Sequence, residues 1–408
     1  MEKQGSAVGV ALLVAGTCVG GGMLALPVIT GPAGFIPSLF LMALACAFMA
    51  ITGLLFVEAN LWLGPGTHFT TMAAKLLGPV GKVVVILLYL FIGYLSLIAY
   101  TAGGGELFEG AIIHLFGAGW GKWVTCTLFI VVFTLIIALG HSRVGRVNEL
   151  LFVAMILAYL FLIVGGIGEV KWHNLLHQDW TFGIYSVPLL LTIFSYQAVV
   201  PSLVIYLNGD GRRLRAAIIW GAIIAFFIYA LWQWLVLGIV PLQGSHGLNH
   251  AFQEGFTATQ SLSRHAAARA LSAVSQFFAF FALATSFLGI ALGLFDFLVD
   301  GLKAKRTGVS KWALLLLIAV PTLIPAVLYP RVFIEALGAS GGFGDAVLNG
   351  MIPVLMVWSG RYRQQLTGSF RVKGGPAFLF VIFVTALFVL VVEILQRINV
   401  LVPINDLR

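Results

Sequence analysis

The sequence predicts an all-α polytopic membrane protein with about eleven transmembrane helices. Hydrophobic residues make up 60% of the 408 positions and charged residues only 9%, whereas soluble domains carry about 25% charged residues. Apolar runs of about 20 residues, the length that spans a bilayer, recur from one end of the chain to the other. No connecting loop is long enough to form a soluble domain. We therefore expect residues 1–408 to form a single transmembrane domain.

The expected spans follow one another with short connections. They lie at 7–29, 34–62, 83–104, 121–140, 148–168, 183–207, 215–240, 268–298, 311–330, 333–358 and 376–398. The tenth is the weakest, because a glycine-rich run from Gly338 to Gly344, followed by Asp345, interrupts it.

The distribution of lysine and arginine predicts the orientation. With the N-terminus in the cytoplasm, 16 of the 23 basic residues fall on the inner side, as the positive-inside rule requires. An odd number of spans then places the C-terminus in the periplasm. The net charge of +8 is thus a topology signal, and we expect no nucleic-acid partner.

The first span contains an unusual concentration of helix-breaking residues. Gly16, Gly20, Gly21, Gly22 and Pro27 lie within twelve positions. In hydrocarbon an unsatisfied backbone group costs several kcal/mol, so a break persists only where it is buried in protein or lines a wet cavity. Transporters bind solutes at such breaks. Glycines that let helices pack closely are the alternative interpretation.

The sixth span repeats this pattern. A polar cluster, Phe194-Ser195-Tyr196-Gln197, interrupts it, and Pro201 follows 174 residues after Pro27. Each half of the chain therefore contains five spans. Because five is an odd number, the second copy enters the membrane in the opposite orientation to the first. The sequence therefore predicts an inverted-repeat transporter, with repeat A at 7–168, repeat B at 183–358 and an extra helix at 376–398.

Three motifs resemble a known family. They are Gly20-Gly21-Gly22-Met23-Leu24-Ala25-Leu26-Pro27, the run from Phe194 to Leu203, and Ser286-Phe287-Leu288-Gly289 through Gly293-Leu294-Phe295-Asp296. The chain is similar over nearly its whole length to the bacterial aromatic amino acid permeases, which are tyrosine- and tryptophan-specific proton symporters. Members often carry a glycine-phenylalanine-histidine-like run where this chain has Ser195-Tyr196-Gln197.

The resemblance implies a leucine-transporter-like fold. Five plus five helices would form the inverted repeat, with broken helices 1 and 6 meeting at mid-membrane and one extra helix at the C-terminus. It also implies a secondary active transporter in the bacterial inner membrane. Such a protein would import tyrosine first and tryptophan next by proton symport with alternating access.

A zwitterionic substrate needs donors for its carboxylate and acceptors for its ammonium. The N–H groups of the glycine run would open a half-helix whose positive end suits a carboxylate. The freed carbonyls of both breaks suit an ammonium group. By analogy with the fold, a tyrosine of the third span also lines the site, although ordinary packing is an equal alternative. The expected substrate-binding residues are Thr17, Cys18, Gly20, Gly21, Gly22, Met23, Phe194, Ser195, Tyr196, Gln197, Tyr94 and Tyr100.

The aromatic side chain of the substrate needs apolar walls with a few polar groups. We expect Phe194 and Tyr196 to stack on it, and Gln197 or Ser195 to hydrogen-bond its phenol or indole. The substrate preference should therefore be set by the sixth span.

Two coupling ions are considered. In the sodium-driven branch of the fold, residues of helix 8 join carbonyls of helix 1 around the ion. Here Ala282, Thr285 and Ser286 have that spacing, with Ala15 and Cys18 as the carbonyl donors, although serine and threonine also bond to helix backbones. The family resemblance instead favours protons.

A proton carrier needs an ionisable group at depth. Glu58 in the second span is the leading candidate, although a structural role is the alternative. The acids Glu106, Glu109, Glu149, Asp296 and Asp300 lie near span ends, where an interfacial or salt-bridged role is the better interpretation.

Other classes of protein are disfavoured. The sequence shows no cluster of acids or histidines within or beside the spans that would indicate an enzyme, and no charged ring typical of a channel. Two histidine pairs, His173/His177 and His246/His250, have the i, i+4 spacing of a zinc pair on a helix, but they lie in outer loops with no obvious third ligand, so we expect no metal site. The three cysteines lie within apolar spans, so we expect no disulfide. We expect no cofactor, no cleaved signal peptide and no obligate protein partner, only a small aromatic amino acid and the lipid bilayer.

Overall fold

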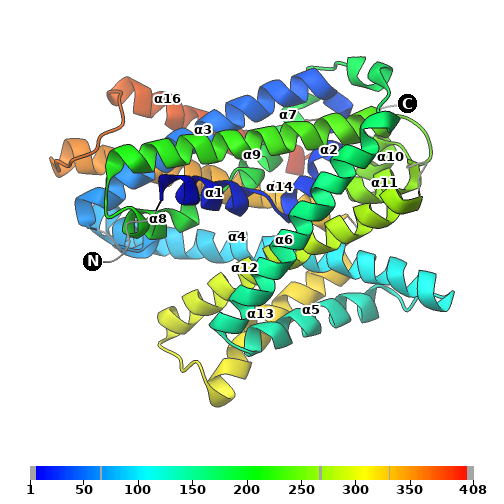
Figure 1. Ribbon diagram of the computed structural model, residues 1–408. Coiled ribbons are helices and arrows are strands. Elements are labelled where there is room, and N and C mark those ends of the chain that lie inside the picture. The colour runs from blue at the N-terminus through cyan, green and yellow to red at the C-terminus, as the bar shows by residue number, and fades with distance from the viewer. Residues whose placement is uncertain (1–5, 65–66, 266–268, 330, 402–408) are drawn as a thin grey trace.

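The computed structural model describes residues 6–64, 67–265, 269–329 and 331–401. Within these ranges all regular structure is helical (Figure 1). Nine of the described helices are long and apolar enough to cross a membrane, and the shorter apolar helices Ala7–Cys18 and Lys122–Ala138 account for the two remaining predicted spans. The chain is thus an all-α, multi-pass membrane protein, as predicted.

The first half of the chain supplies the first five crossings. The first crossing is broken into α1 (Ala7–Cys18), a 3₁₀ turn (Gly21–Leu24) and α2 (Leu26–Thr30). The others are α3 (Phe35–Leu63), α4 (Phe69–Phe116), α5 (Lys122–Ala138) and α6 (His141–Gly166). Helix α4 is longer than its predicted span, because it continues through the preceding surface segment across a kink at Gly78, where φ is 79°.

The second half begins with another broken crossing, α7 (Gly183–Ile193) and α8 (Val200–Tyr206). Helices α9 (Gly211–Ile239), α12 (Arg269–Leu302) and α13 (Gly308–Leu328) follow. The tenth crossing consists of α14 (Val332–Ala339), a π-helix (Ser340–Met351) and α15 (Ile352–Trp358). The last is α16 (Pro376–Arg397), and the loop before α12 carries α10 (Leu248–Glu254) and α11 (Ala258–His265).

The packing of the two halves follows the predicted repeat. Helix α1 packs on α9, and α7 packs on α3. Helix α6 packs on α12, and the π-helix of the tenth crossing packs on α4. Helix α4 packs on α5, and α12 packs on α13. Replacing each helix by the one at the equivalent position in the other half, five crossings away, converts the first pair of each set into the second, which is the pattern that a repeat of five plus five helices produces.

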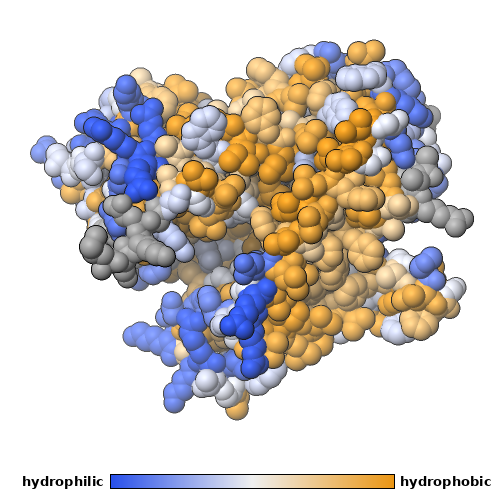
Figure 2. Space-filling view, in the orientation of Figure 1, coloured by the Kyte–Doolittle hydropathy of each residue, from blue (hydrophilic) through white to orange (hydrophobic). Residues whose placement is uncertain are grey.

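The surface has the pattern of a membrane-embedded protein. In the view of Figure 2 a broad hydrophobic region occupies the middle, and hydrophilic residues gather toward the left and right ends. Large apolar side chains on α6 and α13, including Leu157 and Leu316, are more than half exposed. Because contiguous exposed apolar surface of this extent is unfavourable in water, these faces contact lipid.

One fully buried ion pair connects the two halves of the chain. The carboxylate of Glu58, on α3, accepts hydrogen bonds from Arg361 Nε at 2.7 Å and from Arg361 Nη2 at 2.6 Å. Its Oε2 also accepts the backbone N–H of Val372 at 2.7 Å. Both side chains of the pair are almost completely buried. The interaction therefore fixes α3 against the end of the tenth crossing and the loop that follows it.

Removing one partner of this ion pair should destabilise the fold. Arg361→Met leaves the Glu58 carboxylate buried and unpaired, which costs about 3–5 kcal/mol. The double variant Glu58→Gln/Arg361→Met should recover part of that loss, because no isolated charge remains. Thermal unfolding of detergent-purified protein measures both effects, with Arg363→Met on the same turn, whose side chain is exposed, as the matched control. A wild-type unfolding midpoint for Arg361→Met would contradict a structural role for the pair.

Candidate functional site

The two helix breaks meet at a cavity of about 680 Å³. Its walls come from α1, α4, α6, α7, α12 and the π-helix. Ligand pockets for small molecules are commonly about 300–1,000 Å³. The cavity is thus large enough for one amino acid, and the predicted meeting of helices 1 and 6 is present.

Glycine is required in the first break by close packing. After α1 ends, Gly20 is extended, with φ −170° and ψ −154°, and the chain then turns into the 3₁₀ segment. A Cβ atom on Gly21 would lie 2.6 Å from Tyr100 Cε1, and one on Gly20 would clash with Ser286 Oγ. The backbone N–H of Gly21 donates to that same serine oxygen at 2.8 Å. Helix α12 therefore packs directly on the opened backbone.

Helix α9 satisfies backbone groups that the two breaks release. The hydroxyl of Tyr229 lies 2.6 Å from the carbonyl of Cys18 and 2.8 Å from that of Ile193, the last residues of α1 and α7. The indole N–H of Trp232 donates to the carbonyl of Met23 at 2.9 Å. Because both side chains are fully buried, they replace water at these carbonyls. The sequence analysis did not select either residue.

Most of the predicted substrate-binding residues line the cavity. They are Thr17, Cys18, Gly20, Gly22, Tyr100, Ser195 and Tyr196. Tyr196 is nevertheless only 1% exposed, and its hydroxyl donates to the carbonyl of Met49 on α3 at 3.2 Å. Its ring is therefore held against α3 rather than presented flat to a substrate.

Five predicted residues do not line the cavity, contrary to expectation. Gly21 is covered by Tyr100 and Leu283, and Met23 is fully buried. Phe194 packs edge-on against Tyr229, with ring centroids 5.3 Å apart. The other two are Gln197 and Tyr94.

Hydrogen bonds explain the positions of Gln197 and Tyr94. The side-chain amide of Gln197 donates to Met49 O and Thr52 Oγ1, each at 3.2 Å, so it is turned toward α3. The hydroxyl of Tyr94 donates to the carbonyl of Leu317 on α13 at 2.9 Å. Neither side chain points into the cavity in this arrangement, so the position of the Gln197 amide differs from the expectation that the sixth span presents it to the substrate.

The residues expected to hold a sodium ion are only partly brought together. Thr285 and Ser286 line the cavity, but Ala15 and Ala282 do not. The Thr285 hydroxyl donates to Phe281 O at 2.8 Å, and the carbonyl of Ala15 accepts the N–H of Val19 at 3.0 Å. Ser286 Oγ already accepts the Gly21 N–H. These oxygens are thus engaged with the backbone.

The predicted proton carrier, Glu58, also lies away from the cavity. It does not line the walls, and its two oxygens are occupied by Arg361 and Val372. Its surroundings are those of a structural ion pair, the alternative considered from the sequence.

A polar cluster on the π-helix was missed. Asp345 and Asn349 both line the cavity. Ser195 Oγ donates to Asp345 Oδ1 at 2.8 Å, while Asn349 Nδ2 donates to the same oxygen at 2.6 Å and to Ser195 Oγ at 2.9 Å. The available signal was an acid in the middle of an apolar span, which we had assigned to an interruption of the helix.

The cavity opens toward the end of the molecule where α1 begins. Leu12, Leu13 and Thr17 of α1 line it and are exposed, as does Glu149 near the start of α6. Figure 2 shows a hollow on this side, between the upper body of the protein and the projecting lower left part.

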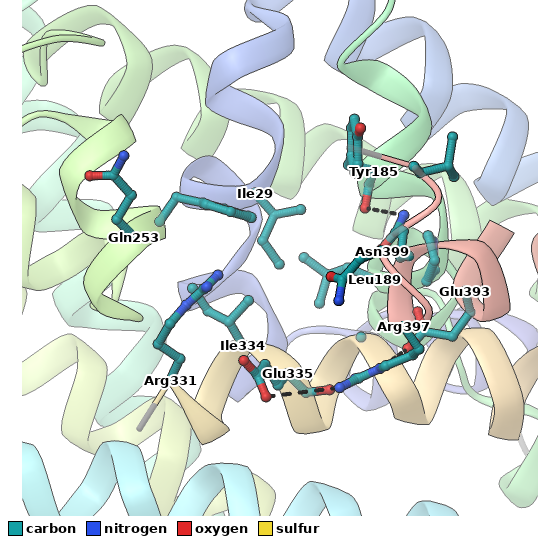
Figure 3. Close-up of a pocket in the computed structure, with 15 residues that line it drawn as sticks. Ile29, Tyr185, Leu189, Gln253, Arg331, Ile334, Glu335, Glu393, Arg397 and Asn399 are labelled. Atoms are coloured by element: carbon teal, nitrogen blue, oxygen red, sulfur yellow. Dashed lines mark hydrogen bonds and ion pairs between the residues drawn. The ribbon is translucent and has the colours of Figure 1, made fainter. Parts of the chain in front are cut away.

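A separate pocket of about 260 Å³ lies toward the opposite end (Figure 3). It is formed by α2, α7, α10, α14, α16 and the segment after α16, and none of its lining residues lines the central cavity. Arg397 crosses one side of this pocket, where its Nε donates to Glu393 at 2.9 Å and its Nη2 donates to Glu335 O at 2.7 Å. The two pockets thus have separate walls among the described residues.

Comparison with known proteins agrees with this architecture. The tryptophan/tyrosine permease family model matches residues 3–393. A tryptophan-specific transport protein of Pseudomonas aeruginosa is 31% identical, with 93% of each chain covered. Tyrosine-specific transport system 1 of Haemophilus influenzae is 31% identical over 94% of this chain and 95% of its own length. A tryptophan-specific transport protein of Haemophilus influenzae is 28% identical, with 92% of each chain covered. The chain therefore belongs to the tryptophan/tyrosine permease family.

Proposed function

We propose that the protein is a secondary active transporter that imports aromatic amino acids across a bacterial inner membrane. Tyrosine is the preferred substrate and tryptophan the next. The observation that carries the proposal is the convergence of two helix breaks on one cavity in a member of a tryptophan/tyrosine permease family. Relatives named for tryptophan transport and for tyrosine transport are about equally similar, so both substrates belong in the first test.

The geometry supports a specific orientation of the substrate. Its carboxylate faces the glycine break, where Gly20 and Gly22 line the cavity and a helical segment begins with its positive end. Its ammonium faces the carbonyls near Cys18 and Ile193. Its ring lies among four of the aromatic side chains that line the cavity, Phe69, Tyr89, Tyr100 and Phe152, because the fifth, Tyr196, is held against α3. The substrate preference is then set by α4 and α6 rather than by the sixth crossing alone.

The transport cycle is one of alternating access. With the N-terminus in the cytoplasm and the C-terminus in the periplasm, the cavity opens inward, and the pocket crossed by Arg397 lies on the periplasmic side. Substrate and coupling ion shift the equilibrium between this conformation and an outward-open one through their differential affinity for the two. Substrate is loaded from the periplasm and released from the cavity described above.

We propose protons as the coupling ion. The Gly21 N–H already occupies a lone pair of Ser286 Oγ, and the Tyr229 hydroxyl lies 2.6 Å from the Cys18 carbonyl, so two of the oxygens that the sodium alternative needs are engaged with the protein. A sodium site between α1 and α12 remains the second candidate, because Thr285 and Ser286 do line the cavity.

Uptake into proteoliposomes tests this function. Purified protein should accumulate labelled tyrosine in sodium-free buffer when the outside is acidic, and a protonophore should abolish the accumulation. Unlabelled tryptophan should compete strongly, phenylalanine less, and leucine weakly. Protein-free liposomes are the control. Strict dependence of uptake on sodium would show that sodium, and not the proton, is the coupling ion. An uptake rate that does not saturate with tyrosine concentration would indicate a channel.

The glycine break provides a matched pair of variants. Gly21→Val should abolish substrate binding, because its Cβ would lie 2.6 Å from Tyr100 and 3.1 Å from Leu283. Gly301→Val, at an exposed position where nothing lies within 4 Å of an added Cβ, should bind normally. Substrate-induced thermal stabilisation measures binding, and size-exclusion chromatography verifies that both variants are folded. Normal stabilisation of Gly21→Val by tyrosine would contradict the site.

Tyr229→Phe tests the link between the breaks. The change keeps the ring that packs on Phe194 but removes the hydroxyl from two carbonyls. A lost hydrogen bond to a buried group costs about 1–3 kcal/mol, so affinity for tyrosine should fall by roughly five- to a hundredfold. Isothermal titration measures the change, and Tyr206→Phe, at an exposed side chain, is the control. Equal tyrosine affinities of the wild type and Tyr229→Phe would show that the hydrogen bonds of Tyr229 to the two breaks do not affect the substrate site.

A further inference from the structure

The cavity contains a buried carboxyl group that lacks a cationic partner. Asp345 is fully buried, and its Oδ1 accepts hydrogen bonds from Ser195 and Asn349. Its Oδ2 has no hydrogen-bond partner within the described residues. An unpaired ionised carboxylate is costly at such depth, so the group must be neutralised by something that the fold itself does not supply.

In the part of the chain that the structure describes, the cavity around Asp345 contains no positively charged side chain that could pair with its carboxylate. Within the described residues no lysine, arginine or histidine lines the cavity. The other titratable groups that line the cavity are Cys18, Tyr89, Tyr100, Glu149 and Tyr196. The elements that pack on the π-helix also carry titratable groups outside the cavity lining, which are Lys75, Lys82, Tyr94, Glu106, Glu109 and His114 on α4, Tyr185 on α7, Cys46 and Glu58 on α3, Glu335 on α14, and Glu393 and Arg397 on α16. Arg361 and Arg397, the bases at this side of the fold, are paired with Glu58 and with Glu335 and Glu393.

We propose that Asp345 is the carboxyl group that binds and releases the transported proton. This inference rests on the proposed function and assigns its coupling step to a residue. In the outward-open state the carboxylate takes a proton from hydronium in the periplasmic water, so one O–H bond of hydronium breaks, one forms on the carboxyl group, and a water molecule is left. In the inward-open state the O–H bond of the acid breaks, the proton passes to water in the cavity as hydronium, and the carboxylate is restored.

Burial distinguishes a proton from other neutralising groups. Asp345 lies in the cavity wall, but its exposed fraction is 0%, so a group as large as a substrate ammonium has no room to contact it in this arrangement. Ser195, which is partly exposed in the cavity wall, connects Asp345 to the cavity through a single hydrogen bond. A hydroxyl can pass a proton along such a contact, whereas it blocks a larger cation.

The same contact couples the proton to the substrate. Ser195 lies in the break of the sixth crossing, two residues after Ile193, whose carbonyl belongs to the proposed ammonium site. When Asp345 is ionised, both Ser195 and Asn349 direct donors to it. When it is protonated on the unpartnered Oδ2, that oxygen becomes a donor, and Oδ1 is left as a weaker, uncharged acceptor for Ser195 and Asn349. Protonation therefore loosens the hydrogen bond that ties Asp345 to the break beside the substrate.

The substitution Asp345→Asn tests the proposal, because it fixes the group in a neutral form of similar shape. In proteoliposomes with labelled tyrosine, the variant should lose acid-driven accumulation completely, so that uptake stops at equal concentrations inside and outside. Exchange of labelled for unlabelled tyrosine, which needs no net proton movement, should continue at a rate comparable with that of the wild type. Asp300→Asn, at a largely exposed acid of α12 that does not line the cavity, should retain acid-driven accumulation.

The outcomes separate the two levels of inference. Failure of the wild type to accumulate tyrosine or tryptophan with an acidic exterior would contradict the proposed function. Accumulation by both the wild type and Asp345→Asn would overturn only the assignment of Asp345. Loss of tyrosine binding in a folded Asp345→Asn protein would overturn it as well, because the carboxylate would then be a substrate ligand.

A second variant covers the case in which Asp345→Asn does not fold. Asp345→Glu keeps an ionisable group but changes its position relative to Ser195. It should retain acid-driven accumulation with a displaced pH for half-maximal uptake. An unchanged pH profile in this variant would contradict proton binding at residue 345.

Discussion

The structure depends on the requirement that every backbone polar group in a bilayer finds a partner. The first and sixth crossings are not continuous helices, so some of their backbone groups have no partner within the helix. Side chains from other helices form hydrogen bonds with these groups instead. The Tyr229 hydroxyl and the Trp232 indole N–H, both on α9, lie at three of the freed carbonyls. Ser286 of α12 accepts the hydrogen bond of the Gly21 N–H. The site is therefore built by the helices that cover the breaks as much as by the broken helices.

The spans and the breaks were predictable because each is a local property of the chain. Hydropathy fixes where a segment can cross the membrane, and glycine and proline fix where a helix cannot continue. The extent of α4 was not predictable in the same way. Its polar surface segment meets the span at Gly78, whose non-helical backbone, with φ 79°, makes a kink between two helical stretches. The tenth crossing likewise continues as a π-helix through its glycines.

The directions of side chains were harder to predict, because they depend on contacts between distant segments. Phe194 and Gln197 sit in the break, as expected, yet Tyr229 and α3 draw them away from the cavity. Asp345 shows the opposite case. Within a glycine-rich run it resembles part of a loop, and only the packing of the π-helix on α7 brings it to Ser195. The sequence contains both residues but no local pattern that pairs them.

Glu58 and Asp345 illustrate how charge compensation divides buried acids by role. Both are fully buried, and hydropathy alone ranks them equally as groups at depth. Glu58 has a bidentate arginine and a backbone N–H, so its charge is matched whether or not the cavity is occupied. Asp345 has only neutral donors on one oxygen and none on the other within the described residues. A matched charge holds helices together through the whole cycle, whereas an unmatched one must change with the state of the cavity, and the unmatched acid is the one bonded to the break.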